Sequence, residues 1–248
     1  MKHFIVTLLV GFWLLGPHAF ADVNAKNGIS ITTASTINGK TPNSAFNGLT
    51  IVSGGGPTLV ASDNFNSYTN GADLGLQSGW STVSGSVGIY KPASDGFTEG
   101  GSQSAARSTA TFNSDQRSVA TCAALSSGSF NFMSVQVRCQ PIVDSRYWFQ
   151  TDGSNWFLVV RIVGAQTVLA SGTQAIAQGE RIRLDATGAG TATRLTAQYY
   201  TGGVWTNVSG AVSIDPGTGL YLDNGTAGIG GDTSGHTALG DDWEGWNL

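Results

Sequence analysis

The chain has 248 residues, of which only 11% are charged, and its formal net charge is −4. Average soluble proteins contain about 25% charged residues, and proteins that bind nucleic acid need a basic surface, so this composition argues against a nucleic-acid partner. Glycine is abundant, with 35 residues, yet aromatic residues make up 10% of the chain. Disordered chains are poor in aromatic residues, so the composition indicates a folded protein rich in turns and strands.

The first 21 residues have the pattern of a secretory signal peptide. Lys2 and His3 form a short basic start, Phe4 to Gly16 is an apolar run, and Ala19-Phe20-Ala21 fits the small-residue cleavage pattern. The apolar run is shorter than the about 20 residues that a membrane-spanning helix needs. We therefore expect residues 1–21 to be removed, and the mature protein to be secreted, extracellular or periplasmic, with no membrane span. An uncleaved anchor is the alternative.

Residues 22–58 are expected to form a small strand-rich appendage and linker. They contain Asn-Gly pairs in INGKT, at 37–41, and in FNGLT, at 46–50. Asn-Gly between strand-forming residues is typical of two-residue hairpin turns. The run Gly54-Gly55-Gly56-Pro57 then indicates a linker. The appendage is either an ordinary stalk or an assembly segment whose strands add to the sheet of a neighbouring copy.

Residues 59–248 are expected to form one all-β domain. Runs rich in strand-forming residues recur along this part of the chain, separated by Asp-Gly, Gly-Gly, Pro-Gly and Asn-Gly pairs. Many short strands at such a spacing predict a sandwich or a barrel. The expected strands are 81–90, 117–125, 130–139, 146–150, 156–163, 167–171, 181–186 and 193–200.

A hairpin over residues 146–163 predicts a face that could bind a ligand. A four-residue loop, Thr151 to Ser154, would pair Phe149 with Trp156 and place the apolar side chains of both strands on one core face. The opposite face then carries the candidate ligand-binding residues Arg146, Trp148, Gln150 and Arg161. Sugars bind to aromatic rings that have a few polar groups beside them. The alternative is that Trp148 packs under a loop with an arginine over its ring.

The two cysteines of the mature chain, Cys122 and Cys139, are expected to be buried thiols. If residues 126–129 form a tight turn, the two cysteines lie about 20 Å apart on the flanking strands, which is too far for a disulfide. A wider loop, over residues 127–134, would place them opposite each other and allow a bridge, which an exported protein tolerates. The strand-like residues after position 129 favour the tight turn.

The residues that carry chemistry do not form a recognisable catalytic set. The mature chain would have one histidine, His236, and we find no G-x-S-x-G, Walker or dinucleotide motif. The densest acidic cluster is Asp241-Asp242-Trp243-Glu244. A metal or capping role is favoured for this cluster over the carboxylate pair that a glycosidase needs.

Several segments in this order resemble a known fold family. The chain resembles concanavalin-A-like, or laminin-G-like, jelly-roll domains in the order of its segments. These segments are D-x-F at 63–65, Trp80, QRSVATCAAL, VQVR, two aromatic strands around a glycine turn, TVLASG, GERIRLDA and the closing DDWEGWNL. The resemblance covers about residues 59–248. It implies an antiparallel jelly-roll β-sandwich in which the first and last strands are neighbours. It also implies a structural calcium near those strands, with Asp63 and Asp241 as candidate ligands; the alternative is that both only cap strand ends.

The sequence therefore favours a secreted, non-catalytic module that binds glycans or adheres to a surface, with a polysaccharide or cell-surface glycan as its partner. A structural subunit of an extracellular fibre or surface assembly, which would self-assemble through residues 22–58, is the alternative. A polysaccharide hydrolase or lyase is the third interpretation, but the E-x-D-x-E strand of glucanases with this fold is missing. Apart from calcium, no cofactor is implied.

Overall fold

A computed structural model describes residues 56–101, 103–125, 131–232 and 236–248, together with four two-residue strands nearer the N-terminus. The chain divides into two compact units, Met1–Gly56 and Pro57–Leu248. The expected signal peptide and the Asn-Gly pair at 38–39 lie outside the described residues. None of the helices in the described part of the chain has the length and apolar character needed to cross a membrane.

Among the described residues of the N-terminal unit there are two antiparallel strand pairs. The pairs are β1 (Val23–Asn24) with β2 (Ser30–Ile31), and β3 (Ala45–Phe46) with β4 (Leu49–Thr50). Because Phe46 pairs with Leu49, only Asn47 and Gly48 separate β3 from β4. This spacing agrees with the two-residue turn expected for Asn-Gly. The role of residues 22–58 in self-assembly stays a prediction.

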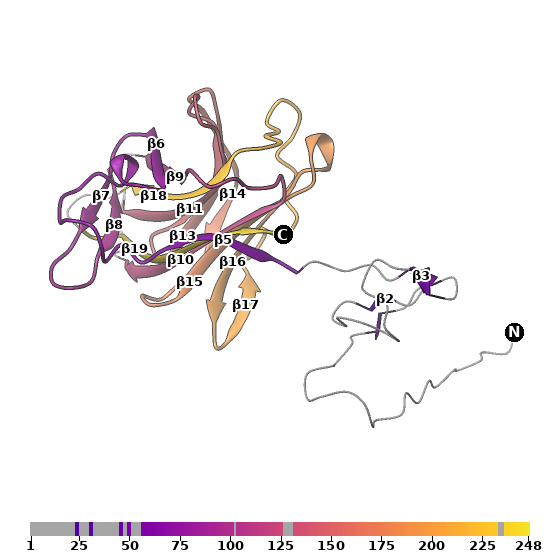
Figure 1. The fold of residues 1–248 in the computed structure, drawn as a ribbon, viewed down its shortest axis with the longest axis horizontal. Helices are drawn as coiled ribbons and strands as arrows, with labels where there is room; N and C mark the ends of the chain where they lie inside the picture. Colours follow the sequence, from indigo (N-terminus) through magenta and orange to yellow (C-terminus); the bar gives the residue numbers. More distant parts are fainter. Residues whose placement is uncertain are drawn as a thin grey trace, which may run out of the picture. The chain divides into compact units, whose positions relative to one another are not determined.

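The second unit is an antiparallel β-sandwich of two sheets (Figure 1), which confirms the predicted all-β jelly-roll sandwich. The eight-stranded sheet has the order β17-β16-β15-β10-β19-β8-β7, and β5 also pairs with β19. These strands are β5 (Thr58–Asp63), β7 (Val87–Tyr90), β8 (Phe97–Gly100), β10 (Gln116–Ala124), β15 (Arg181–Thr187), β16 (Arg194–Thr201), β17 (Val204–Asn207) and β19 (Leu239–Asn247).

The seven-stranded sheet has the order β14-β13-β12-β11-β18-β9-β6. Its strands are β6 (Trp80–Ser84), β9 (Ser104–Ser108), β11 (Phe132–Cys139), β12 (Arg146–Thr151), β13 (Asn155–Ile162), β14 (Ala165–Thr173) and β18 (Thr226–Asp232). Two short 3₁₀ helices, η1 (Leu74–Leu76) and η2 (Gly190–Ala192), lie in the connections.

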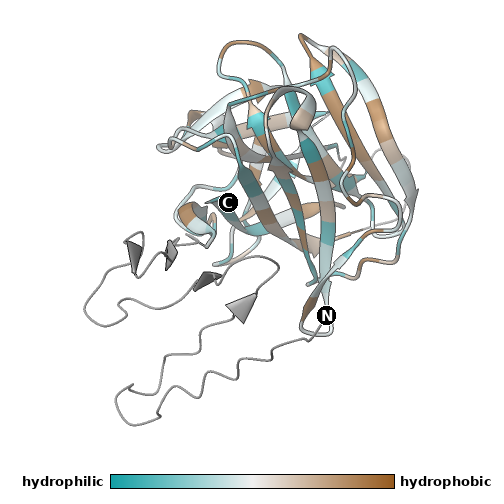
Figure 2. Ribbon diagram, turned by 90° about the vertical axis from the view of Figure 1, so that its right-hand side faces the viewer, coloured by the Kyte–Doolittle hydropathy of each residue, from teal (hydrophilic) through white to brown (hydrophobic). Residues whose placement is uncertain are grey.

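Alternation of polar and apolar residues explains why these segments form half-buried strands. In β15, Ile182, Leu184 and Ala186 are fully buried, whereas the intervening residues Arg181 and Arg183 are partly exposed. Successive side chains of a strand point to opposite faces, so the apolar set faces the other sheet and the polar set faces outward. Figure 2 shows the same alternation as hydrophilic and hydrophobic bands along neighbouring strands.

The hairpin of β12 and β13 supplies much of the core, but its predicted register is wrong. Phe149 pairs with Leu158, and Trp156 pairs with Thr151, so the strands are displaced by two residues from the expected pairing. The loop is shorter than expected because the Asp152 carboxylate accepts hydrogen bonds from the backbone N–H groups of Ser154 (2.8 Å) and Asn155 (2.6 Å). A two-residue shift keeps every side chain on its face, so the predicted core side is confirmed.

Residues 81–90 were expected to form one strand and instead form parts of two. β6 ends at Ser84 and belongs to the seven-stranded sheet, whereas β7 begins at Val87 and belongs to the eight-stranded sheet. Gly85, between them, has a φ of 58°, a conformation that glycine adopts without steric cost. The chain therefore turns from one sheet to the other within a continuous run of strand-forming residues.

Cys122 and Cys139 are both buried and unbridged, as predicted. The predicted hairpin that kept the two cysteines apart is wrong, however, because β10 and β11 belong to different sheets and do not pair with each other. Cys122 pairs with Gly240 of β19, and Cys139 pairs with Thr226 of β18. Burial raises the pKa of the Cys139 thiol to about 12 and also raises that of Cys122, so both thiols are unreactive.

The first and last strands of the sandwich are neighbours, as the resemblance implied. β5 pairs antiparallel with β19, from Thr58 opposite Asn247 to Asp63 opposite Trp243. A bulge interrupts the pairing of β19 with β10, and Asp242 within it has a φ of 45°. Bulges redirect side chains and are frequent beside functional sites, and this one lies next to a cavity described below.

Candidate functional site

The four predicted ligand-binding residues lie together on the outer side of the seven-stranded sheet. Trp148 is only 3% exposed, and the guanidinium carbon of Arg146 lies 4.9 Å from the centre of its ring. The Trp148 indole N–H donates to the Gln150 side-chain oxygen at 2.6 Å. The structure thus has the alternative arrangement, in which an arginine covers the ring, and the ring offers little area for a sugar.

The two arginines of this group hold neighbouring loops against the sheet. Both form ion pairs with Asp144, and for Arg161 the Nη1 to Oδ2 distance is 2.8 Å. Both also bind Gln103, with Arg146 Nη2 donating to its backbone oxygen (3.0 Å) and Arg161 Nη2 to its side-chain oxygen (2.8 Å). Burial lowers the pKa of Arg146. These contacts account for both arginines structurally, and ligand binding by this face stays a prediction.

Asp63, the first of the two predicted calcium ligands, ends β5 and already accepts three hydrogen bonds. Its Oδ1 accepts from the backbone N–H of Phe65 (2.8 Å), and its Oδ2 accepts from the Tyr68 hydroxyl (2.5 Å) and the Trp80 indole N–H (2.8 Å). Calcium requires several free carboxylate or carbonyl oxygens. Because both carboxylate oxygens of Asp63 already accept hydrogen bonds, Asp63 fits a capping role better than the role of a metal ligand.

Asp241, the second predicted ligand, lies among other carboxylates at the start of β19. Its pKa is raised to about 6, chiefly by burial and further by the charges of Asp242, Asp95 and Asp63. Within the described ranges, no three His, Cys, Asp or Glu side chains are placed to hold a metal ion together. Calcium binding at Asp63 and Asp241 accordingly stays a prediction. The raised pKa of Asp241 provides a way to test it.

We expect Asp241→Asn to stabilise the protein at pH 7 by roughly 1–2 kcal/mol, allowing for partial solvent screening. Between about pH 4 and pH 6 the folded state keeps a proton on Asp241 that the unfolded chain has lost, so stability falls as pH rises through this window. The asparagine removes this penalty and retains an oxygen to accept the backbone N–H of Asp242, which Asp241 accepts at 2.7 Å. Urea unfolding of both proteins at pH 4 and pH 7 measures the difference, which should vanish at pH 4.

Asp215→Asn is the matched control for this prediction. Asp215 is exposed, and its pKa is lowered by hydrogen bonds from the backbone N–H of Gly217 and the hydroxyl of Tyr221, so its replacement should not stabilise. Addition of millimolar calcium at pH 7 provides the second measurement. Calcium could raise the urea midpoint of unfolding of the parent protein while Asp241→Asn lowers stability instead of raising it. In that case Asp241 is a calcium ligand, and the stabilisation expected from removing its buried charge is wrong.

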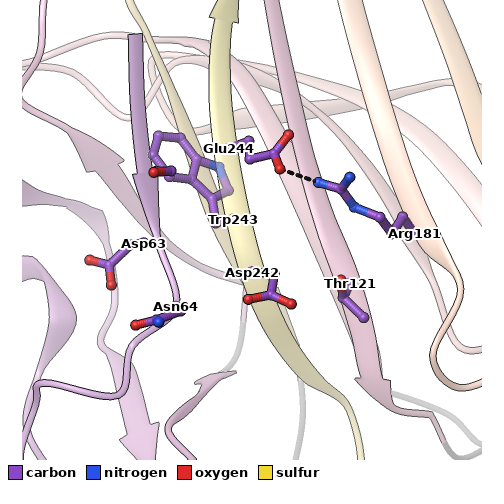
Figure 3. A pocket seen from close by; sticks show the side chains of 8 residues that line it. Asp63, Asn64, Thr121, Arg181, Asp242, Trp243 and Glu244 are labelled. Carbon is purple, nitrogen blue, oxygen red and sulfur yellow. Dashed lines mark ion pairs between the residues drawn. The ribbon is translucent and has the colours of Figure 1, made fainter. Parts of the chain in front are cut away.

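The outer side of the eight-stranded sheet has a cavity of about 520 Å³ that the sequence did not predict (Figure 3). The lining residues come from the end of β5 and from β10, β15 and β19, and they are Ser62, Asp63, Asn64, Thr121, Arg181, Asp242, Trp243 and Glu244. Figure 3 shows Arg181 and Glu244 joined by an ion pair, with 2.8 Å between Nη2 and Oε1. The volume is in the range of small-molecule sites, and the lining is mostly polar.

Strand register connects this cavity to two aromatic rings. Thr121 pairs with Asp241 on one side and with Arg181 on the other, Arg181 pairs with Tyr200, and Tyr200 pairs with Trp205. These five residues form one line across β19, β10, β15, β16 and β17, which we call the cross-strand row. Neighbouring strands are about 4.8 Å apart, so the row is about 19 Å long.

The aromatic end of the cross-strand row is open to solvent. The Tyr200 and Trp205 ring centres are 5.2 Å apart, and Arg183 lies 4.6 Å from the centre of the Trp205 ring. Tyr200 is 37% exposed and Trp205 is partly exposed. Within the described part of the chain, neither the Trp205 indole N–H nor the Tyr200 hydroxyl makes a hydrogen bond. Unlike Trp148, these rings keep both surface area and polar groups for a ligand.

Polar groups in and beside the row are incompletely satisfied. Gln198 pairs with Arg183 across β15 and β16 and donates to the Asn207 side chain at 2.7 Å. Its Oε1 and the Arg183 Nε are buried and have no hydrogen-bond partner among the described residues, and the same holds for Arg181 Nε and Nη2. Arg181 therefore meets Glu244 as a charge contact without hydrogen-bond geometry and keeps N–H groups that could turn toward a ligand.

His236, the histidine of interest for catalysis, lies apart from the cross-strand row. Its ring stacks on Tyr90 at 3.8 Å between centres and contacts the Glu99 carboxylate. Within the described residues no hydroxyl group donates to it, so these contacts do not make a Ser-His-Asp triad. His236 is exposed and lies in the loop before β19.

Comparisons with known proteins give similarities of fold. No protein-family model and no curated protein matches the sequence. The structure is similar to a carbohydrate-binding module, CBM66 from Bacillus subtilis, with 14% identity over 68% of this chain and 97% of that one, and a TM-score of 0.46. It is also similar to domain 4 of AbnA, a GH43 extracellular arabinanase from Geobacillus stearothermophilus in complex with arabinotriose, with 12% identity over 77% of this chain and 93% of that one, and a TM-score of 0.39.

A whole enzyme gives a partial match of the same kind. Xylan beta-1,4-xylosidase from Bacillus halodurans C-125 is 12% identical over 75% of this chain, with a TM-score of 0.41, and this chain spans 39% of its length. At these identities and scores, the matches assign neither a family nor a ligand to this chain.

Proposed function

We propose that the mature chain is a secreted, non-catalytic, concanavalin-A-like module that binds a glycan along the cross-strand row. The observation that carries this proposal is the exposed pair Tyr200 and Trp205, whose polar groups are unused, in register with the polar cavity at Arg181. Extracellular location would follow from the signal-peptide pattern of residues 1–21.

The row combines the two kinds of contact that sugars need. Aromatic rings pack against the C–H faces of sugar rings, and a few polar groups fix the orientation of the hydroxyls. The guanidinium carbon of Arg183 lies 4.6 Å from the centre of the Trp205 ring, and the partial exposure of Trp205 leaves ring surface that a sugar can contact. At the cavity, Glu244 and Asp242 can accept hydrogen bonds from hydroxyl groups, and Arg181 can donate them.

Trp205→Ala is expected to weaken polysaccharide binding at least about tenfold, because truncating an aromatic side chain that packs against a ligand typically costs about 1–2 kcal/mol or more. Affinity electrophoresis of the mature protein in gels that contain neutral and acidic polysaccharides measures the effect. Trp205 is partly exposed on the edge strand β17, so its replacement should leave the fold intact, which the unfolding midpoint checks.

Gln150→Ala is the control, because Gln150 lies on the outer side of the other sheet and belongs to the face predicted from the sequence. This variant should bind as the parent protein does. Binding that is lost in Gln150→Ala and kept in Trp205→Ala would transfer the site to the β12 face. A mature protein that binds no polysaccharide in the panel would overturn the proposed function.

A further inference from the structure

We infer that the cross-strand row takes a linear, uncharged glycan over about four sugar units, with Trp205 at one end of the site and the cavity beside Asp242 at the other. This inference rests on the proposed function and adds the ligand's length, charge class and placement. It is carried by the register of the strands, the different chemistry of the two ends and the charge balance of the sheet face.

The length of the row sets the number of sugar units. Four strand spacings separate Asp241 from Trp205 along the paired residues, a span of about 19 Å. A sugar unit in an extended chain advances by nearly one strand spacing, so about four units cover the row. At the Trp205 end the row stops because β17 is the edge strand of its sheet.

The two ends of the row offer different contacts. At one end, Tyr200 and Trp205 present ring surface, and the Arg183 guanidinium contacts the indole ring at 4.6 Å. At the other end the cavity is lined by carboxylate, amide and hydroxyl side chains together with Arg181 and Trp243. Ring surface tolerates many sugars, whereas hydrogen-bonding groups in a cavity distinguish them. The cavity should therefore determine which sugar is accepted, and Trp205 should add affinity for longer chains.

The charges of this sheet face favour an uncharged ligand. Arg117 is paired with Asp185 through two contacts of 2.7 Å, and Arg181 is paired with Glu244 at 2.8 Å. Arg183 lies 3.8 Å from Asp185. The additional carboxylates at the cavity end, Asp241 and Asp242, have no ion-pair partner among the described residues. Arg181 is the cation among the residues that line the cavity, and it is already paired with Glu244, so a uronic or sulfated chain would meet these carboxylates without an unpaired cation in the cavity lining.

Isothermal titration with neutral oligosaccharides of increasing length tests the length and placement. The oligosaccharides are prepared from whichever neutral polysaccharide the mature protein binds in the electrophoresis panel. Affinity should rise up to about four units and then level off. Trp205→Ala should weaken tetrasaccharide binding at least tenfold and change disaccharide binding less than threefold, while Trp205→Phe should restore part of the loss. Asp242→Asn should weaken binding of all lengths by a similar factor.

Two further results would overturn the inference while leaving the proposed function standing. The first is an affinity that levels off at the disaccharide, or a Trp205→Ala variant that weakens short and long chains equally. The second is tighter binding of an acidic polysaccharide than of neutral ones, with an affinity that falls steeply between 50 mM and 500 mM salt. If no saccharide binds at all, the proposed function fails, and the inference fails with it.

Discussion

Arg138→Ala is expected to lower the free energy of unfolding by about 3–5 kcal/mol, a large share of the total stability of a domain of this size. The Arg138 side chain is completely buried, and its contacts join segments that are distant in sequence. Its Nε donates to the backbone oxygen of Ser114 at 3.0 Å, and its Nη1 donates to the Thr193 hydroxyl at 3.1 Å. Its terminal nitrogens also donate to the backbone oxygens of Gly188 and Leu222.

The backbone at Arg138 is shaped to make these contacts. Its φ is 53°, and the pairing of β11 with β18 shifts register there. Burial lowers the pKa of Arg138, while Tyr147, Asp115 and Asp223 oppose this shift. Alanine would leave three carbonyls and a hydroxyl without their donor in the interior, which costs more than the loss of the hydrogen bonds themselves.

Urea unfolding at pH 7, followed by tryptophan fluorescence, measures this effect, and Arg194→Ala is its matched control. Arg194 also donates to backbone oxygens, those of Thr191 and Thr193, and lies 3.5 Å from Asp215, but its side chain is 39% exposed. Its replacement should cost less than about 1 kcal/mol. Equal losses of unfolding free energy in the two variants would show that burial of the Arg138 side chain does not increase its contribution to stability.

Most strands of the sandwich could be predicted from the sequence because each has one buried face. The alternation in residues 181–186 and the apolar side of the β12–β13 hairpin both follow from period-two patterns that need no knowledge of the partner strand. Pairing partners were harder to predict. The assumed hairpin of β10 and β11, and the single strand over 81–90, failed because neighbouring segments can enter different sheets without any change in their composition.

The candidate site could be predicted in its chemistry but not in its location. An aromatic ring with arginine and glutamine on one strand face indicated sugar binding at Trp148, but alternation does not show what covers the outer face of a sheet. Loops at Gln103 and Asp144 cover it through Arg146 and Arg161. On the other sheet, Arg181 and Tyr200 lay in predicted strands.

What the sequence could not supply for that second sheet was the alignment of its strands. Residues 204–207, which include Trp205, were too short to be recognised as a strand, and pairing across five strands brings together residues far apart in the chain. A signal was present in the outward arginines of residues 181–186. These arginines indicate a binding site only when Tyr200 and Trp205 are known to lie beside them.

Asp63→Asn is expected to destabilise the sandwich by about 2–3 kcal/mol, because it removes two charge-assisted hydrogen bonds, one from Tyr68 in the turn after β5 and one from Trp80 at the start of β6 in the opposite sheet. The asparagine oxygen can still accept the backbone N–H of Phe65, but its amide nitrogen cannot accept from Tyr68 or Trp80. The loss would extend to the C-terminal strand, because the Trp80 ring packs 4.7 Å from that of Trp243.

The titration of Tyr68 distinguishes this explanation from a general loosening of the fold. Its pKa is raised above the ordinary value, first by burial and then by the hydrogen bond and charge of Asp63, so in Asp63→Asn the phenol should ionise at a lower pH than in the parent. Tyrosinate absorbance measures this. Asp73→Asn, which alters a carboxylate bound to the Gly75 N–H and the Ser86 hydroxyl, should cost about 1 kcal/mol or less and leave Tyr68 unchanged. If Tyr68 titrates identically in Asp63→Asn and the parent protein, Asp63 does not hold its hydroxyl, and the explanation of the stability loss through these hydrogen bonds is wrong.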